Sequence, residues 1–421
     1  MTSTLAPPDA PAPRAARSRR SNPLWRAVFI AVAVLAILAI TGAVSGAVDL
    51  TSAGTAGAAL TLTVPILLAG LAGLWSERAG VVNIGLEGMM VLGTWCAAYG
   101  SLHGGPWVGL ISGAVGGALG GAVHALATVT FGVDHIVSGV AMNLLGPGIA
   151  RFLSSLLFTD VPGGGVTQSP QVEQPPTFTV PGVSSALTSI AERQIAGISD
   201  LAAVLAGFVT GISWATVIAL ALIPGSWYVL WRTRLGLRLR SCGENPYAAE
   251  ALGVNVLRYK YLAVIVSGAM AGLGGAFLSL VASNFYREGQ TGGRGFIGLA
   301  AMIFGNWRPG GLAMGAALFG YTDAVQLRQG ETSVHALFLA VGIALALVGA
   351  WLIVRVSRRL GVTCLVLAAL ALAVYFLADT IPSQFVSATP YVTTLLVLGL
   401  ASQRLRMPSA DGLVYRKGTA K

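Results

Sequence analysis

Residues 333–354 read SVHALFLAVGIALALVGAWLIV, an apolar run whose one titratable side chain is His335. A helix of about 20 apolar residues is long enough to cross the hydrocarbon core of a bilayer. The whole chain has the same character, because 55% of its 421 residues are hydrophobic and 10% are charged, against about 25% charged in an ordinary soluble domain. This composition excludes a soluble multidomain enzyme and predicts an all-α polytopic membrane protein.

Apolar runs of this kind recur along the chain and predict about ten transmembrane helices. A transmembrane domain is therefore expected over residues 25–403, between a disordered basic tail at 1–24 and a second basic tail at 404–421. The first run is long for a signal peptide and is expected to stay as a span. The ten runs are 25–49, 57–75, 80–102, 107–131, 135–158, 208–231, 259–282, 333–354, 361–378 and 388–403.

The net charge of +10 is concentrated in segments that flank apolar runs. Basic residues cluster before the first run, in the loop 232–258, near 355–359 and in the C-terminal tail. With ten crossings, all four clusters fall on one side, which the positive-inside rule makes the cytoplasm, and both termini lie there. The loop 159–200, which contains Asp160 and Glu173, is then external. A nucleic-acid-binding surface is disfavoured because no aromatic platforms are interleaved with the basic residues.

Residues 295–327, GFIGLAAMIFGNWRPGGLAMGAALFGYTDAVQL, do not fit the count of spans. They contain two apolar pieces, each too short to span comfortably, with a hinge at residues 306–311. We interpret them as a re-entrant hairpin inside the helical bundle. Where backbone leaves a helix at membrane depth, its N–H and C=O groups must form hydrogen bonds with protein or with water in a cavity. A second glycine-interrupted piece, AGVVNIGLEGMM, lies at 79–90, and paired broken segments point to a transport path. The alternative is two independent glycine-rich packing seams.

The first broken piece also carries the densest polar cluster near an apolar stretch. Glu77 and Arg78 are expected at the membrane interface. Asn83 and Glu87 are four residues apart, so on one helix they would share a face and present an amide and a carboxylate to a solute. The alternative is that Glu87 caps or braces a neighbouring broken helix.

The loop 232–258, RTRLGLRLRSCGENPYAAEALGVNVLR, encodes a short helix at its centre. Asn245 is a favourable N-cap, Pro246 suits the first helical position, and Gly253 suits the left-handed position after the helix. A helix this short is marginal alone in water, so it must dock on something. It is either a coupling helix inserted into a soluble partner or a turn that covers its own bundle.

Patterns typical of enzymes are missing from the sequence. It contains no GxxxxGK[ST] phosphate-binding loop, no HExxH or other metal-ligand spacing, and no recognisable nucleophile elbow. Asp134 beside His135 is interpreted as a helix N-cap, and the three cysteines as packing residues. Neither catalysis nor a cofactor or metal is expected in this chain.

Three stretches resemble one family, the inner-membrane permease subunits of bacterial ABC importers, in the branch that imports nucleosides and related sugars. They are SERAGVVNIGLEGMMVLG at 76–93, GENPYAAEALGVNVLRYKYLAV at 243–264 and GRGFIGLAAMIFGNWRPGG at 293–311. Residues 388–418 are similar to the family's closing span and basic tail. The chain departs from the family in its N-terminal tail, its long outer loop and an extra span near 361–378.

The resemblance implies a type II-like importer permease in the bacterial cytoplasmic membrane. Its implied partners are a second homologous permease, with which it would form a heterodimer, an ATP-binding cassette subunit below and a lipoprotein-type solute-binding protein above. ATP-driven closure would reach the chain through the central loop, at Glu244, Asn245, Pro246, Ala249, Glu250 and Gly253. The implied solute path contains Asn83, Glu87, Phe296, Asn306 and Trp307.

The expected function is import of a nucleoside by alternating access, with simple sugars or another small polar solute as the alternative. A secondary transporter would need proton or ion relays within the membrane, for which Glu87 and Asp323 are the chief candidates. A membrane enzyme is disfavoured by the missing catalytic patterns.

Overall fold

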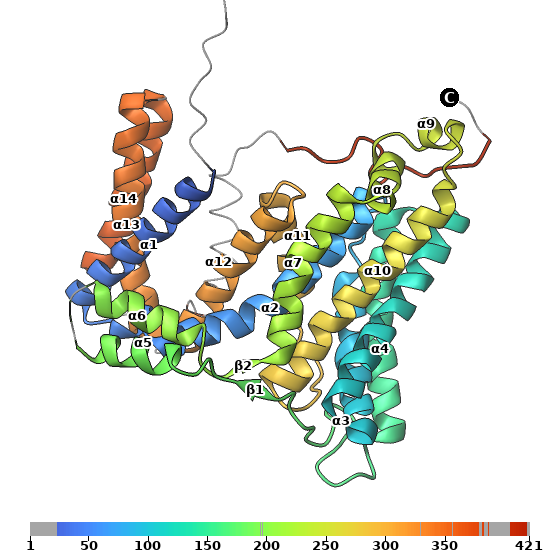
Figure 1. Cartoon of the computed structure of the whole chain (residues 1–421), viewed down its shortest axis with the longest axis horizontal. Helices are drawn as coiled ribbons and strands as arrows, with labels where there is room; N and C mark the ends of the chain where they lie inside the picture. The colour runs from blue at the N-terminus through green and yellow to red at the C-terminus, as the bar shows by residue number, and fades with distance from the viewer. Residues whose placement is uncertain are drawn as a thin grey trace, which may run out of the picture.

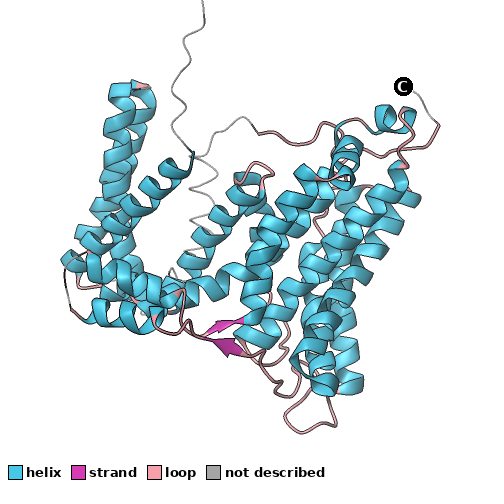
Figure 2. Cartoon of the chain, in the orientation of Figure 1, coloured by secondary structure: helices cyan, strands magenta, loops and turns pink. Residues whose placement is uncertain are grey.

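The computed structural model describes residues 23–193, 195, 197–328, 330–355, 357–378, 381–382, 386 and 405–418. These residues are helical apart from loops and one antiparallel pair of two-residue strands, β1 (Thr177–Phe178) and β2 (Ile212–Ser213) (Figures 1 and 2). The long helices are α1 (Pro23–Ser45), α2 (Ala53–Arg78), α3 (Leu86–Ala125), α4 (His135–Leu157), α7 (Trp214–Arg232), α10 (Val256–Phe277), α12 (Pro309–Leu327), α13 (Gly330–Arg355) and α14 (Arg358–Leu377). The shorter ones are α5 (Val183–Glu192), α6 (Ile198–Gly207), α8 (Arg234–Glu244), α9 (Pro246–Ala251) and α11 (Arg294–Phe304).

Within the described residues, seven helices are long and apolar enough to cross a membrane. Six of them, α2, α4, α7, α10, α13 and α14, coincide with predicted spans. The seventh is α3 with its π-helical extension to Thr130, which is broken by Gly105 (φ 79°, ψ 178°) before Pro106. The two arms fold back on each other, because a Cβ on Gly113 would lie 3.0 Å from the carbonyl oxygen of Gly93. They correspond to the predicted spans 80–102 and 107–131.

The two ends of the predicted topology are less completely described. The first predicted span, 25–49, corresponds to α1, a helix of 23 residues. The last predicted span, 388–403, and the tail residues 1–22 lie outside the described residues. The count of ten crossings therefore stays a prediction.

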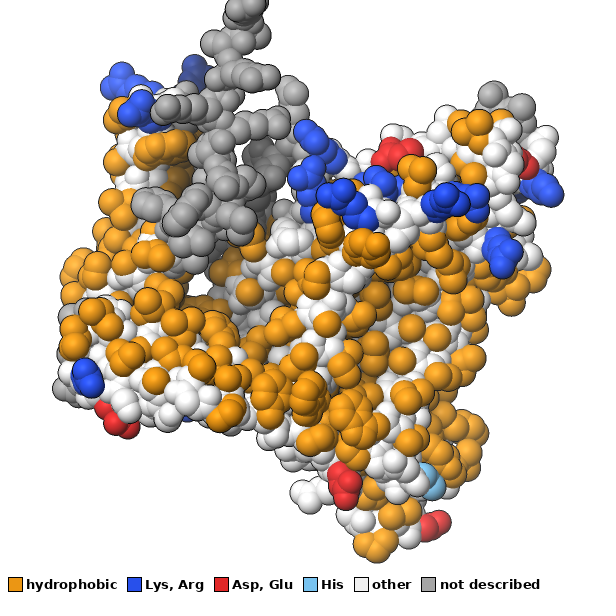
Figure 3. Space-filling model, viewed as in Figure 1, with side chains coloured by type: hydrophobic (Ala, Val, Ile, Leu, Met, Phe, Trp, Pro, Cys, Tyr) orange, Lys and Arg blue, Asp and Glu red, His pale blue; other side chains and the backbone are white. Residues whose placement is uncertain are grey.

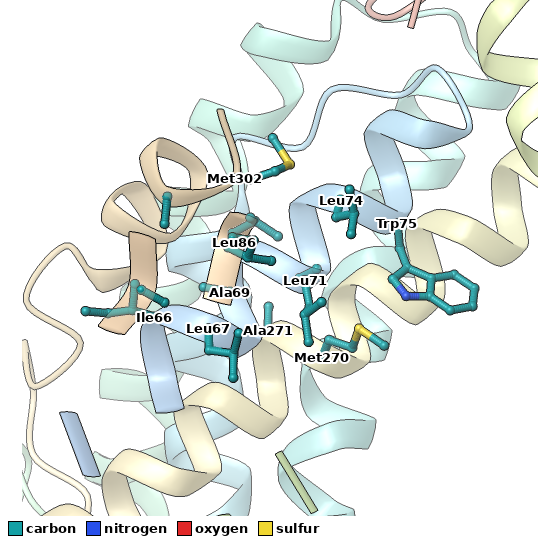
Figure 4. Close-up of a cluster of buried hydrophobic side chains, with 14 of the residues drawn as sticks. Ile66, Leu67, Ala69, Leu71, Leu74, Trp75, Leu86, Met270, Ala271 and Met302 are labelled. Carbon is teal, nitrogen blue, oxygen red and sulfur yellow. The ribbon is translucent and has the colours of Figure 1, made fainter. Parts of the chain in front are cut away.

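The core of the molecule is built around α2. Ile66, Leu71 and Leu74 of α2 are fully buried. Helices α3, α10, α11 and α12 all contact α2. Figure 4 shows side chains of α2 converging with Leu86 of α3, Met270 of α10 and Met302 of α11. Outside this core, α13 and α14 pack against each other at one side of the molecule (Figure 1).

The predicted hairpin is present but its limbs are unequal. Its first limb, α11, has 11 residues and its second, α12, has 19. The hinge is residues 305–308, slightly earlier than expected, because Pro309 begins α12 at a position where proline is favoured. Both limbs press on α2: a Cβ on Gly70 would lie 2.2 Å from Leu312 and 2.8 Å from the carbonyl oxygen of Gly298. The hairpin therefore packs on α2 through both limbs, and Met314 and Leu318 of α12 are exposed.

The predicted outer loop 159–200 is partly helical, which the sequence interpretation missed. It contains α5 and the start of α6, and α6 continues to Gly207. The side chain of Asp200 accepts the backbone N–H of Gly197 at the start of α6, and it also accepts the hydroxyl of Thr51 at 2.5 Å. The hydrogen bond between Thr51 and Asp200 therefore connects the loop to the segment that precedes α2.

Candidate functional site

The start of α11 packs against α2, one of the seven helices that are long and apolar enough to cross a membrane. A Cβ on Gly298, one turn into α11, would lie 2.8 Å from the backbone nitrogen of Gly70 in the middle of α2. The carboxylate of Glu87 meets this end, accepting the N–H of Gly293 at 2.8 Å and the N–H of Gly295 at 2.7 Å. Helix N-termini leave such amides without intrahelical partners, and a carboxylate also suits the positive end of the helix dipole. The structure thus shows the capping role that was the alternative interpretation of Glu87.

An ion pair lies beside this cap. The guanidinium of Arg294 donates to Oδ2 of Asp323 at 2.9 Å and joins α11 to α12. The side chains are 18% and 12% exposed, so both charges are largely removed from solvent. Charges at membrane depth usually pair in this way. Sequence interpretation named Asp323 as a possible ion relay but missed Arg294, its partner 29 residues away.

Phe296 is the exposed member of this group. It lies in the first turn of α11 and is 47% exposed. Glu87 is half-buried on the neighbouring α3. Of the five residues predicted for the solute path, Glu87 and Phe296 lie together at the start of α11, whereas Asn306 and Trp307 lie at its other end.

Asn83 lies elsewhere, in the non-helical segment before α3. It is fully buried, and its Nδ2 donates to the hydroxyl of Ser267 on α10 at 3.0 Å. The expectation that Asn83 and Glu87 share a helical face is wrong, because the helix begins only at Leu86, after a turn through Gly80 (φ 78°). Asn83 attaches this segment to α10.

Asn306 and Trp307 form the hinge at the other end of α11, about 16 Å from its start at 1.5 Å per residue. Both have left-handed backbone conformations, with φ of 53° and 52°. Trp307 is 3% exposed, its Nε1–H donates to Glu77, and its carbonyl oxygen accepts from Arg78 at 2.7 Å. Glu77 is 6% exposed, so the end of α2 holds the hinge through buried contacts, and the expected position of Glu77 and Arg78 at the membrane interface stays a prediction.

The central loop contains the short helix that the sequence predicts. The side chain of Asn245 accepts the N–H of Ala248 at 3.0 Å, Pro246 is at the first position of α9, and Gly253 has φ 81°. Pro246 and Ala249 are buried, whereas Leu252 is 85% exposed. The rest of the loop is more regular than expected, because α8 precedes α9 directly.

Another predicted cap is also confirmed. Oδ1 of Asp134 accepts the N–H groups of Ile136 and Val137 at 2.9 and 3.0 Å, at the start of α4.

Residues 405–418 lie against the same end of the molecule, which the sequence interpretation did not anticipate. The N–H of Ala410 donates to the carbonyl oxygen of Gly243 at 2.9 Å, and the hydroxyl of Ser409 donates to Glu244 at 3.1 Å. Asp411 is 9% exposed. Burial, and next the negative charge of Glu77, raise the pKa of Asp411 above its ordinary value, against a smaller opposing effect of Lys260. The tail is therefore part of the folded protein.

Comparisons with known proteins agree on one family. The protein-family model described as "Branched-chain amino acid transport system / permease component" matches residues 55–338. The chain is 34% identical to the nucleoside ABC transporter permease protein NupC of Lactococcus lactis subsp. cremoris over 85% of this chain and 95% of that protein. It is 31% identical to the guanosine ABC transporter permease protein NupQ of Bacillus subtilis, over 86% and 96% respectively.

A sugar relative is equally similar. The chain is 34% identical to the "Putative glucose ABC transporter permease protein TsgC13" of Haloferax volcanii, over 85% of this chain and 96% of that protein. No solved structure matches the chain significantly. The family match covers the core helices, the α8–α9 segment and the α11–α12 hairpin. The chain belongs to this family of ABC transporter permeases and is a non-catalytic, multi-pass membrane subunit.

Proposed function

We propose that the chain is the transmembrane subunit of an ATP-driven importer that moves nucleosides across the bacterial cytoplasmic membrane. The observation that carries the proposal is α9, a capped six-residue helix at one end of an apolar bundle. One side of α9 is docked on the protein itself, where Pro246 and Ala249 are buried, whereas Leu252 after its last turn is 85% exposed and available to a partner. An ABC permease works with an ATPase subunit, and we assign α9 and its flanks, residues 244–253, to that contact.

The remaining partners follow from the same proposal. A second homologous permease would complete the path across the bilayer, and an extracytoplasmic lipoprotein would deliver the solute. Lys and Arg side chains gather at the end that carries α8 and α9 (Figure 3), which supports a cytoplasmic position for this end and for both termini. ATP hydrolysis takes place on the partner subunit.

The solute path is proposed to pass the start of α11. Phe296 offers an exposed aromatic face there, and the Glu87 cap and the Arg294–Asp323 pair supply polar groups around it. A nucleoside has an aromatic base and ribose hydroxyls, which suit one stacking side chain and a few hydrogen-bonding groups. Relatives named for nucleoside and guanosine transport support this choice. The relative named for glucose makes a simple sugar the second candidate.

Gly253 supplies a test of the coupling helix. A Cβ at Gly253 would meet no atom within 4 Å, but its φ of 81° strains a β-branched side chain. We expect Gly253→Val to abolish nucleoside uptake in cells while the permease stays in the membrane. Gly253→Asn, which tolerates the left-handed conformation, is the matched control and should retain most of the uptake.

The same uptake assay separates the two substrate classes. Excess unlabelled guanosine or uridine should suppress uptake of labelled nucleoside, and excess glucose should not. If the cells take up labelled glucose and excess nucleoside does not suppress that uptake, the transported solute is a sugar and the nucleoside assignment is wrong. Normal uptake by Gly253→Val would remove the coupling role of α9.

A further inference from the structure

The C-terminal stretch 405–418 crosses the end of the molecule that carries α8 and α9 (Figure 1). It has no helix or strand of its own. Its order therefore comes from contacts with other elements, and those contacts fall at three separate places.

The first contact is with the hinge of the α11–α12 hairpin. The backbone N–H of Arg406 donates to Oδ1 of Asn306 at 2.7 Å. Asn306 is the first of the two hinge residues with a left-handed backbone, and Trp307 is the second. The tail thus contacts the hinge about which α11 and α12 would move relative to each other.

The middle of the tail binds the ends of α8 and α2. Ser409 and Ala410 contact Glu244 and Gly243, the last residues of α8. A Cβ on Gly80 would lie 3.1 Å from the carbonyl oxygen of Ala410, so the tail also packs closely on the segment after α2. The tail is therefore hydrogen-bonded directly to the end of α8 and packed on the segment after α2.

The last contact is with the coupling helix itself. Tyr415 is 8% exposed and forms a cluster with Cys242, Ala249 and Val256. Its ring lies 5.4 Å from that of Tyr247 between centroids. Its hydroxyl faces Glu250, whose negative charge adds to burial in raising the pKa of Tyr415. Ala249 and Tyr247 are residues of α9, so the tail covers the side of α9 that faces the bundle.

We propose that residues 405–418 are a coupling element that joins α9 to the hinge of the α11–α12 hairpin. A displacement of α9 by an ATPase subunit then reaches Asn306 through the tail, in addition to the route through α8 and the end of α2. The inference rests on the proposed docking of an ATPase at α9. It assigns Arg406 and Tyr415 as positioning residues, since neither touches the solute in this arrangement.

The test breaks each end of this connection separately and then together. Asn306→Gly removes the acceptor of the Arg406 N–H while keeping a residue that tolerates φ 53°. Tyr415→Ala removes the contact with α9. Lys417→Ala, an exposed position on the same tail, is the matched control. Each permease is reconstituted in liposomes with its partner subunits, and retention of the ATPase subunit, ATP hydrolysis and solute uptake are measured.

Both single variants should retain the ATPase subunit but lower the uptake per ATP hydrolysed by about fivefold or more. Because the two contacts act in series, the double variant should fall within about twofold of the weaker single variant. Asn306→Asp keeps an acceptor oxygen, so its uptake per ATP hydrolysed should fall less than that of Asn306→Gly.

Two results would overturn the proposal: single variants that match Lys417→Ala, or losses that multiply in the double variant as they do for independent sites. A wild-type permease that retains no ATPase subunit would instead overturn the proposed function, and this inference with it.

Discussion

Glu87 connects two parts of the chain that are far apart in sequence. Its carboxylate accepts N–H groups 206 and 208 residues away, at the start of α11. Because Glu87 is half-buried, water can only partly replace its carboxylate as the acceptor of these N–H groups. The side chain therefore holds the broken helix in place whatever part it has in solute recognition.

Replacing Glu87 should weaken the fold in a graded way. We expect Glu87→Ala to lower the free energy of unfolding by about 1–3 kcal/mol, since it leaves the two amides without their acceptor. Glu87→Gln should lower the free energy of unfolding by a smaller amount, because its amide oxygen still accepts one N–H. Denaturant unfolding of the purified permease in detergent, followed by circular dichroism, measures the difference.

Glu173→Ala is the control, because Glu173 is an exposed acid of the outer loop and surface changes usually stay within about 0.5 kcal/mol. An unfolding curve for Glu87→Ala that superimposes on that of Glu173→Ala would contradict the capping role.

Residue-scale prediction from sequence succeeded where the partner is near in the chain. Asn245 accepts from Ala248 and Asp134 from Ile136, both within one helical turn, so residue type and spacing were sufficient. The partners of Asn306 and Arg294 lie 100 and 29 residues away. No spacing rule relates such positions, because tertiary packing alone brings them together.

At the scale of elements, glycines determine how closely the helices approach. Gly113, Gly117 and Gly121 form a GxxxGxxxG row on the second arm of α3, and it faces Gly268 and Gly272 of α10. A Cβ on Gly117 would lie 2.2 Å from the carbonyl oxygen of Gly268. Small residues at this spacing allow membrane helices to pack backbone against backbone.

Enlarging Gly117 should therefore separate α3 from α10. Gly117→Ala forces a clash with backbone and should destabilise the permease by about 1–3 kcal/mol, and Gly117→Leu should prevent recovery of a monodisperse protein. Gly225→Leu on α7 is the control, because a Cβ there meets nothing within 4 Å. Size-exclusion profiles and unfolding temperatures of the three variants provide the measurement. Equal behaviour of Gly117→Leu and Gly225→Leu would exclude close packing at this seam.

The existence of most elements could be predicted from sequence, but their ends and their docking could not. Apolar runs located α2, α4, α7, α10, α13 and α14 because a bilayer selects for length and apolarity. The apolar runs do not predict helices α5, α6 and α8, since each is shorter than a span. The close contact between α9 and the tail was equally hidden, because it depends on packing between segments more than 150 residues apart.

For the whole molecule, the distribution of charge predicts its orientation. Apolar side chains cover the visible face between the two ends, and Lys and Arg gather at the end with α8 and α9 (Figure 3). Moving such a cluster across the membrane is unfavourable, which is the basis of the positive-inside rule. The end with Leu252 is thus expected in the cytoplasm and the loop with Glu173 outside.

Cysteine labelling tests this orientation in cells that express the permease alone, so that no ATPase subunit covers α9. In a background with Cys96, Cys242 and Cys364 replaced by alanine, a membrane-impermeant maleimide should label Glu173→Cys in intact cells. Leu252→Cys, at a position that is 85% exposed, should be labelled only after the cells are permeabilised. The unsubstituted background is the control for non-specific reaction. Labelling of Leu252→Cys in intact cells would place α9 outside, where no ATP-hydrolysing subunit could reach it, and the proposed importer mechanism would then be untenable.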